Sequence, residues 1–440
     1  MFRKMGRRTS VSSSQSPNNA ENLTGEGGAF DSLGDSQSKE KHRNKVQLRF
    51  DVPLLLTVIT FLIIGLVMVY SASYDYSNIY YDNATTIFYR QLIWLGIGVV
   101  CSFILTLFDY HKWNKFAVFA MGFTVVALLS VLIVNEVRNG AVRTLFEGSI
   151  QPSEMAKLVI IIYLAVWLSA KQEKLGEIGF GLIPLAIILG LFGGLIIIQP
   201  DFSAVATIII LGGLMFFLAG GDLKQIGILL AISMVIGWGI IQLSPTGSAR
   251  IEYFMAGLMD PTEGSYHVRR SLEAIIKGGW FGVGIGEAET KLTGLPVPPT
   301  DSIFAVVGEE TGVIGSAILV ILFAVFMWRG FVVAHGAPDQ LGMLLAGGLT
   351  LWVSLEAFIN MAVMVNLLPF AGNALPFVSA GGSNLIVSLA AVGIILNISR
   401  LSEINKVEQG KIINAVVDLR RRYRRRRLSS SRRTASRKNA

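Results

Sequence analysis

Charged residues are scarce in this chain of 440 residues, because Asp, Glu, Lys and Arg together make up only 15% of it. A typical soluble protein has about 25%. The chain also has one cysteine, Cys101, and four histidines that stand far apart in the sequence. These shortages exclude a disulfide-stapled domain, give no His/Cys pattern for a metal, and argue against a large soluble protein.

Apolar residues, in contrast, supply 52% of the chain and are concentrated in long runs. A helix needs roughly 20 residues to cross a hydrocarbon core of about 30 Å. The runs therefore predict an all-α polytopic membrane protein with about ten transmembrane helices. The predicted spans are 53–72, 88–108, 116–134, 154–170, 182–200, 203–220, 225–243, 304–327, 341–365 and 382–399.

Basic residues predict the orientation of these spans. Nine of the 38 Lys and Arg lie in the first fifty residues, and fourteen lie from Arg400 onward. Six more fall in the even-numbered connections. Because Lys and Arg near spans stay on the cytoplasmic side, both termini are predicted to be cytoplasmic. The longest connection, at about 244–303, is then extracytoplasmic.

The composition divides the chain into three parts. Residues 1–50 are polar and are predicted to be a disordered cytoplasmic tail, 51–400 form the ten-helix membrane domain, and 401–440 form a basic cytoplasmic tail. The arginines of the second tail favour contact with anionic lipid head groups, with docking of a cytosolic partner as the alternative. Nucleic-acid binding is not expected, because no base-stacking or groove-reading module accompanies these charges.

A few charged residues stand where apolar side chains would be expected. A charge at the bilayer centre costs about 2.5–3.5 kcal/mol even on the lenient insertion scale, so such residues face a cavity or each other. Glu154 and Lys157 are three residues apart at the start of a predicted helix and share a face. They either neutralise each other or contact a substrate, together with Arg143 in the preceding loop. Ser153 is the predicted cap of this helix.

Two other patterns leave alternatives open at the sequence level. Asp201 follows Pro200 between two apolar runs, where a tight-turn role and a substrate role are equally supported. Five glycines at 278, 279, 282, 284 and 286 resemble a phosphate-binding loop, but no strand precedes them and no Lys-Ser/Thr follows. Close packing of a re-entrant loop explains these glycines better.

Asp260 stands in the long outer connection, just before Pro261. A loop of about sixty residues with mixed charge inside a compact protein usually has a function. The alternative is that Asp260 only initiates an Asp-Pro turn.

Several short motifs follow one another in a fixed order from Asp51 to about Arg400. They are YSAS at 70–73, Arg90-Gln91, Asp109-Tyr110, NGA at 139–141, QPSE at 151–154 with Lys157, QPD at 199–201, Arg250 ten residues before Asp260-Pro261, GEE at 308–310, Asn360, LPF at 375–377 and GGS at 381–383. In that order they resemble the SEDS family (shape, elongation, division and sporulation) of FtsW, RodA and SpoVE, with FtsW as the best match. The resemblance implies an all-helical bundle of ten spans with both termini inside.

The resemblance also implies an activity, the inverting transfer of sugar that polymerises lipid II at the outer face of the cytoplasmic (inner) membrane, for cell division or elongation. In that reaction a sugar hydroxyl attacks the anomeric carbon of the growing strand and lipid pyrophosphate leaves. The step needs a base near the hydroxyl and positive charge near the pyrophosphate. The family's essential acidic residue aligns with Asp260, and Tyr266 follows at the family's spacing. Asp260 is therefore expected to be the general base or to position the acceptor.

The resemblance implies further site residues and partners. No metal ligand or cofactor is identified, and a requirement for a divalent cation is left open. The expected partners are lipid II, a single-span class B penicillin-binding protein with transpeptidase activity, and other divisome proteins. The candidate substrate-binding residues are Arg143, Glu154, Lys157, Asp201, Arg250 and Asp301.

Two other functions compete with polymerisation. A lipid II flippase would also have ten spans and charges within the membrane. A division scaffold that has weakened catalysis is the second alternative, because Thr144 and LPVPPTD at 295–301 depart from the family's pattern. Asp260 discriminates between polymerase and flippase, since an acid on the outer connection has a purpose in polymerisation and none that is evident in flipping.

Overall fold

The computed structural model describes residues 50–134 and 151–407, and within these ranges every regular element is a helix. Eight of the described helices are long and apolar enough to cross a membrane, and two shorter apolar helices accompany them. The long helices are α1 (Val52–Tyr81), α2 (Thr86–Leu107), α3 (Trp113–Val134), α4 (Pro152–Lys171), α7 (Leu223–Leu243), α10 (Ile303–His335), α11 (Gln340–Met364) and the last helix, Gly382–Val407, and the shorter ones are α5 (Leu182–Ile197) and α6 (Phe202–Leu218).

The predicted fold class, an all-α polytopic membrane protein, is confirmed. Each of the ten predicted spans overlaps one of these helices, because about twenty apolar residues in a row can bury their backbone polar groups in lipid only as a helix. The number of helices that cross the bilayer and the side on which each terminus lies stay predictions. The two predicted tails lie almost wholly outside the described residues.

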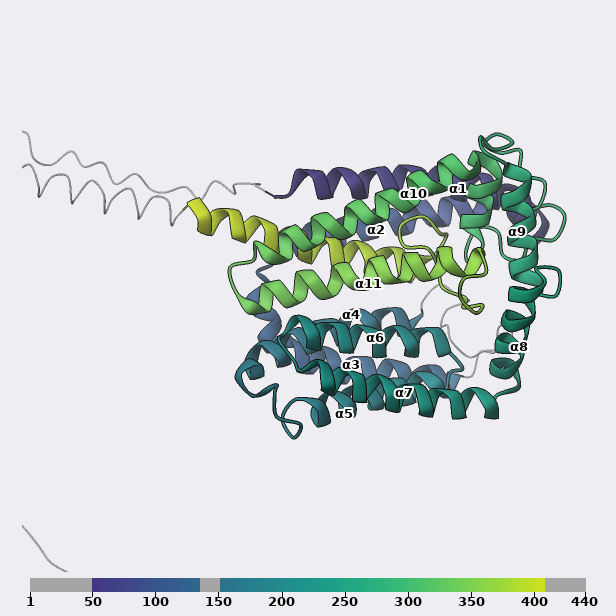
Figure 1. Cartoon of the computed structure of the whole chain (residues 1–440). Coiled ribbons are helices and arrows are strands. Elements are labelled where there is room, and N and C mark those ends of the chain that lie inside the picture. The colour runs from purple at the N-terminus through teal and green to yellow at the C-terminus, as the bar shows by residue number, and fades with distance from the viewer. Residues whose placement is uncertain (1–49, 135–150, 408–440) are drawn as a thin grey trace, which may run out of the picture. The chain divides into compact units, whose positions relative to one another are not determined.

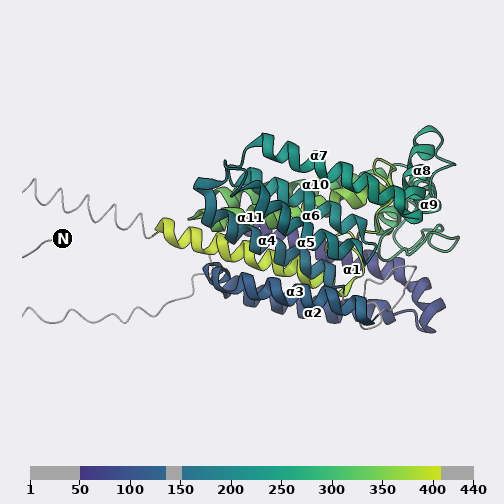
Figure 2. The same ribbon diagram turned by 90° about the horizontal axis from the view of Figure 1, so that it is seen from below.

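The helices pack side by side around α11 and the last helix, whose side chains are mostly buried. Figure 2 shows α7 at one edge of the bundle and α2 and α3 at the opposite edge. These edge helices carry exposed apolar side chains, such as Ile133 on α3 and Leu243 on α7. Such surfaces suit contact with lipid, because lipid chains are as apolar as the side chains themselves.

The long connection between α7 and α10 contains two helices that were not predicted, α8 (Pro245–Met259) and α9 (Tyr266–Gly278). Figure 1 shows both running across one end of the bundle, where α7 ends and α10 begins. Ser244 and Ser265 cap their N-termini by accepting hydrogen bonds from backbone N–H groups of the first turns. These two helices are too short and polar to have been found among the apolar runs.

Helix α10 is broken at Gly312, which has φ +70°, and the glycine-rich segment 278–284 is inserted at the break. The predicted close packing is present at Gly278 and Gly282, where an added β-carbon would lie 2.0 and 2.1 Å from the carbonyl oxygens of Gly308 and Glu310. At Gly279 and Gly286 an added β-carbon would meet nothing within 4 Å. Four backbone hydrogen bonds join the two segments: Val283 N to Glu309 O (3.0 Å), Gly284 N to Glu310 O (3.1 Å), Val313 N to Gly279 O (2.9 Å) and Ile314 N to Trp280 O (3.2 Å).

Candidate functional site

Asp260 ends helix α8 and is exposed in the turn that leads to α9. Its Oδ1 accepts hydrogen bonds from the backbone N–H (2.8 Å) and the hydroxyl (2.7 Å) of Thr262. These two bonds hold the pKa of the Asp260 carboxyl below its ordinary range, so the carboxylate is ionised at neutral pH. Within the described residues no hydrogen bond reaches Oδ2. The Asp-Pro turn is thus present, and one carboxylate oxygen is still available to a ligand.

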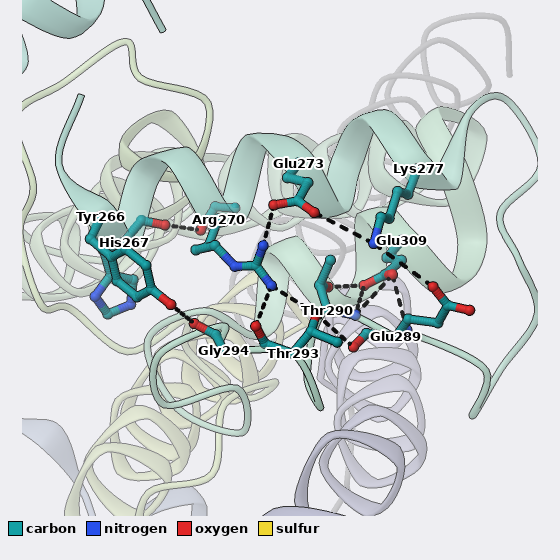
Figure 3. Close-up of polar contacts among 11 residues, drawn as sticks. Tyr266, His267, Arg270, Glu273, Lys277, Glu289, Thr290, Thr293, Gly294 and Glu309 are labelled. Carbon is teal, nitrogen blue, oxygen red and sulfur yellow. Dashed lines mark hydrogen bonds and ion pairs between the residues drawn. The ribbon is translucent and has the colours of Figure 1, made fainter. Parts of the chain in front are cut away.

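The polar residues of α9 join this helix to the returning limb of the outer connection, residues 289–294. Arg270 forms an ion pair with Glu273 and donates from Nη2 to the backbone oxygen of Thr293 (2.6 Å). At the start of the helix, the Tyr266 hydroxyl donates to the backbone oxygen of Gly294 (2.9 Å). Figure 3 shows these contacts along one side of α9. They fix the helix that follows Asp260.

Phe370 connects α8 and α9 with the segment after α11. The guanidinium of Arg250, on α8, lies 5.6 Å from the centre of the Phe370 ring. His267, on α9, stacks on the same ring at 4.4 Å and forms a hydrogen bond of 2.7 Å with Ser302. Burial lowers the pKa of His267 to about 4, so its imidazole is neutral at pH 7.

Glu154 and Lys157 form the predicted ion pair, with 2.8 Å between Lys157 Nζ and Glu154 Oε1. A second carboxylate, Glu356 on α11, also contacts Nζ. The Lys157 side chain is only 4% exposed, and Nζ lies 5.8 Å from the ring centre of Trp352. We call Glu154, Lys157 and Glu356 the charged triad. The sequence analysis missed Glu356, although a lone acid within an apolar run was a visible signal.

Asp201 is the N-cap of α6 and is almost completely buried. Its Oδ1 accepts from Ser203 Oγ (2.9 Å) and its Oδ2 accepts from Ser153 Oγ (3.3 Å) and Gln151 Nε2 (3.2 Å). The predicted cap of α4 was wrong, because Gln151 is the N-cap residue and Ser153 bonds to Asp201 instead. Helix α4 begins at Pro152, whose missing N–H costs nothing in a first turn.

Asp301 and Arg143 complete the predicted set. The backbone oxygen of Asp301 accepts from Asn360 Nδ2 (2.9 Å), and its carboxylate lies beside Gly372, where an added β-carbon would be 3.0 Å from Oδ2. Arg143 lies outside the described residues. Within those residues no group of three or more His, Cys, Asp and Glu side chains is arranged to hold a metal ion.

The predicted residues fall into two groups at the same end of the bundle. Asp201 and the Glu154–Lys157 pair meet at the start of α4, whereas Arg250 lies on α8 and Asp260 follows its last residue. The segment that follows α11 runs between the two groups. In this segment, Ala380 N donates to Pro299 O (2.7 Å) of the outer connection. Ser383 Oγ of the same segment accepts from Gln151 N (3.2 Å) at the start of α4. Whether both groups bind one substrate stays a prediction.

Comparison with known proteins assigns this arrangement of helices to one class, the multi-pass membrane proteins of the cell cycle. A family model described as "Cell cycle protein", FTSW_RODA_SPOVE, matches residues 52–404. Stage V sporulation protein E of Bacillus subtilis is 38% identical over 356 residues, which are 79% of this chain and 97% of the relative. A probable peptidoglycan glycosyltransferase FtsW of a Geobacter species is 37% identical over 357 residues, which are 80% of this chain and 96% of the relative. The chain belongs to the FtsW/RodA/SpoVE family.

Solved structures show the same fold. The rod shape determining protein RodA of Thermus thermophilus superimposes with a TM-score of 0.60 at 23% identity, covering 80% of this chain and 98% of that protein. A chain from a peptidoglycan synthase complex superimposes with a TM-score of 0.66 at 24% identity, with the same coverage of 80% and 98%. The resemblance inferred from the motifs is therefore confirmed at the level of family and fold.

Proposed function

We propose that this protein is a peptidoglycan glycosyltransferase that polymerises lipid II into glycan strands at the outer face of the cytoplasmic membrane. Membership of the family supports the proposal, as do relatives named as probable peptidoglycan glycosyltransferases. The single observation that carries it is Asp260, an ionised carboxylate on the outer connection with one oxygen to which no described residue donates a hydrogen bond. Such a group can accept a proton from a substrate hydroxyl.

In the proposed reaction, the acceptor hydroxyl gives its proton to Asp260 as its oxygen forms a bond to the anomeric carbon of the growing strand. The bond between that carbon and the lipid pyrophosphate breaks at the same time. A base in this position typically contributes about 10²–10⁴ in rate. Thr262 holds the carboxylate in one orientation, so Oδ2 points to a fixed place relative to α8 and α9.

The departing pyrophosphate needs positive charge, which the proposal assigns to Arg143, Lys157 and Arg250. Arg250 lies on α8, the helix that ends just before Asp260, and is half-buried against Phe370. Lys157 already contacts two carboxylates, so it would have to leave one of them to bind a phosphate. Asp201 and Asp301 are proposed to orient the substrate from the neighbouring helix ends.

The expected partners belong to the proposal as well. The solved peptidoglycan synthase complex, which coordinates polymerization and crosslinking, supports a single-span class B penicillin-binding protein that would cross-link the strands this chain makes. Other divisome proteins are also expected partners. The extended tails, at 1–50 and 401–440, favour a role in division, as in FtsW, over one in elongation.

Polymerisation of fluorescent lipid II by the purified protein, with and without the transpeptidase, tests the proposal. Strands longer than a few disaccharides would support it. Translocation of lipid II across proteoliposome membranes without polymerisation would replace it with the flippase alternative. If the protein shows neither activity but binds the transpeptidase stably, the scaffold alternative would replace the proposal.

A further inference from the structure

Glu309 is a buried residue near the start of α10. Among the described residues no Lys, Arg or His side chain forms an ion pair with it, but three groups donate hydrogen bonds to its side chain. It is 1% exposed. Its oxygens accept hydrogen bonds from the backbone N–H groups of Glu289 (3.0 Å) and Thr290 (3.1 Å) and from the Thr290 hydroxyl. A buried donor or acceptor left without its partner costs about 1–3 kcal/mol, so these bonds are kept. Glu309 therefore fixes the returning limb of the outer connection at residues 289–290.

The next residue holds the same limb from another side. Lys291 Nζ lies 3.1 Å from Glu310 Oε1, and it also donates to the backbone oxygens of Gly286 (2.7 Å) and Ser71 (3.2 Å). The side chains of Glu310 and Lys291 are 0% and 4% exposed. Two consecutive residues of α10 thus anchor residues 289–291 to the membrane bundle.

From this anchor a series of hydrogen bonds leads to α9, as Figure 3 shows. Thr293 and Gly294 follow Thr290 by three and four residues. Arg270 donates to the backbone oxygen (2.6 Å) and the hydroxyl (2.7 Å) of Thr293, and Tyr266 donates to the backbone oxygen of Gly294 (2.9 Å). The first two turns of α9 therefore take their position from the limb that Glu309 holds.

The series ends at the turn of Asp260. Arg269, beside Arg270 on α9, donates from Nη1 to the backbone oxygen of Thr262 (3.3 Å). Thr262 in turn donates twice to the Asp260 carboxylate. Residues 260–263 are exposed, and this series is one path that connects them with buried side chains.

We infer that Glu309 is a positioning residue for Asp260, acting through Thr290 and α9. The inference rests on the proposed function, because it assigns Glu309 a part in the reaction of Asp260. A misplacement of about 1 Å at a reacting group can cost about 10²-fold in rate. Glu309 touches no substrate and takes no proton.

Glu309→Gln tests this role, with Glu289→Gln as the matched control. Both remove one carboxylate, but the Glu289 side chain is 78% exposed and lies 3.8 Å from its nearest partner, Lys277. Glu309→Gln is expected to lower turnover at saturating lipid II about tenfold or more, with an apparent KM within about twofold of the unchanged protein. Glu289→Gln is expected to leave both values unchanged. Equal effects of the two variants would overturn the inference.

A spin label reports the position of the turn independently of activity. It is placed at Glu263→Cys in a protein that also carries Cys101→Ser, the only native cysteine being removed. Glu309→Gln should increase the mobility of the label, and Glu289→Gln should leave it unchanged. A label that is equally immobile in the Glu309→Gln protein would overturn the inference.

Two gentler variants decide the matter if Glu309→Gln fails to fold. Thr290→Val removes only the hydroxyl that donates to Glu309, and Thr290→Ser retains it. Valine should lower turnover and mobilise the label, and serine should restore both. No difference between them would refute the role. A protein that lacks polymerase activity before any substitution would contradict the proposed function, while the spin label would still test the positioning.

Discussion

Lys157→Met is expected to destabilise the bundle much more than Glu356→Gln, because the charged triad has two carboxylates and one ammonium. All three side chains are largely buried, with 4% of Lys157, 1% of Glu356 and 12% of Glu154 exposed. Removing the ammonium leaves two carboxylates without a counter-charge, and loss of one partner from a buried pair costs about 3–5 kcal/mol. Glu356→Gln leaves Lys157 balanced by Glu154, so it should cost only about 1 kcal/mol.

Thermal unfolding of the purified protein in detergent measures both variants, followed as the loss of monodisperse protein with temperature. The double variant Lys157→Met/Glu356→Gln should be more stable than Lys157→Met alone, because it removes one of the two uncompensated charges. The coupling should be at least about 1 kcal/mol. A Lys157→Met protein as stable as the unchanged one, or a Glu356→Gln protein that is less stable than Lys157→Met, would refute this electrostatic reasoning. A stable Lys157→Met protein that needs more lipid II would instead support phosphate binding.

Three other features give direct tests. Gly282→Ala should open the segment inserted into α10 and speed proteolysis of the outer connection, because φ is +80° and the added β-carbon would lie 2.1 Å from a backbone oxygen of α10; unchanged proteolysis would contradict this. The pKa of His267 is about 4 in the folded protein and ordinarily 6.5, so between these pH values the unfolded chain binds a proton that the folded protein does not. The free energy of unfolding should therefore decrease as the pH falls from 6.5 toward 4, by about 2 kcal/mol at pH 5. A His267→Gln protein with the same pH dependence would contradict the assignment of this effect to His267. An impermeant thiol reagent should label a cysteine replacing Glu263 and spare one replacing Glu177, whereas the reverse result would invert the topology.

The helices of the bundle could be predicted from the sequence because each is encoded locally. A run of about twenty apolar residues specifies a membrane helix without reference to the rest of the chain. The helices α8 and α9 could not be found in this way, because they are short and partly polar. They depend on caps at Ser244 and Ser265 and on packing at the end of the bundle.

The candidate site was only partly predictable, for a related reason. The pairing of Glu154 with Lys157 follows from helix geometry over three residues, and it is present. The third member, Glu356, is 199 residues from Lys157 in sequence, and no local pattern connects the two. Glu309 was visible only as part of a family motif, since its partner Thr290 comes from the separate outer connection.

The carboxylate of Asp260 carries the central claim, and lipid II polymerisation by the purified Asp260→Asn protein tests it most directly. Asparagine keeps the size of the side chain and can still accept from Thr262, but it cannot take a proton. Because Asp260 is exposed and outside the bundle, the variant should be monodisperse and as stable as the unchanged protein. Its rate should fall by about 10²–10⁴ even at saturating lipid II. Glu263→Gln, singly and together with Asp260→Asn, shows whether the neighbouring acid compensates. A stable Asp260→Asn protein that makes long strands at the unchanged rate would contradict the account.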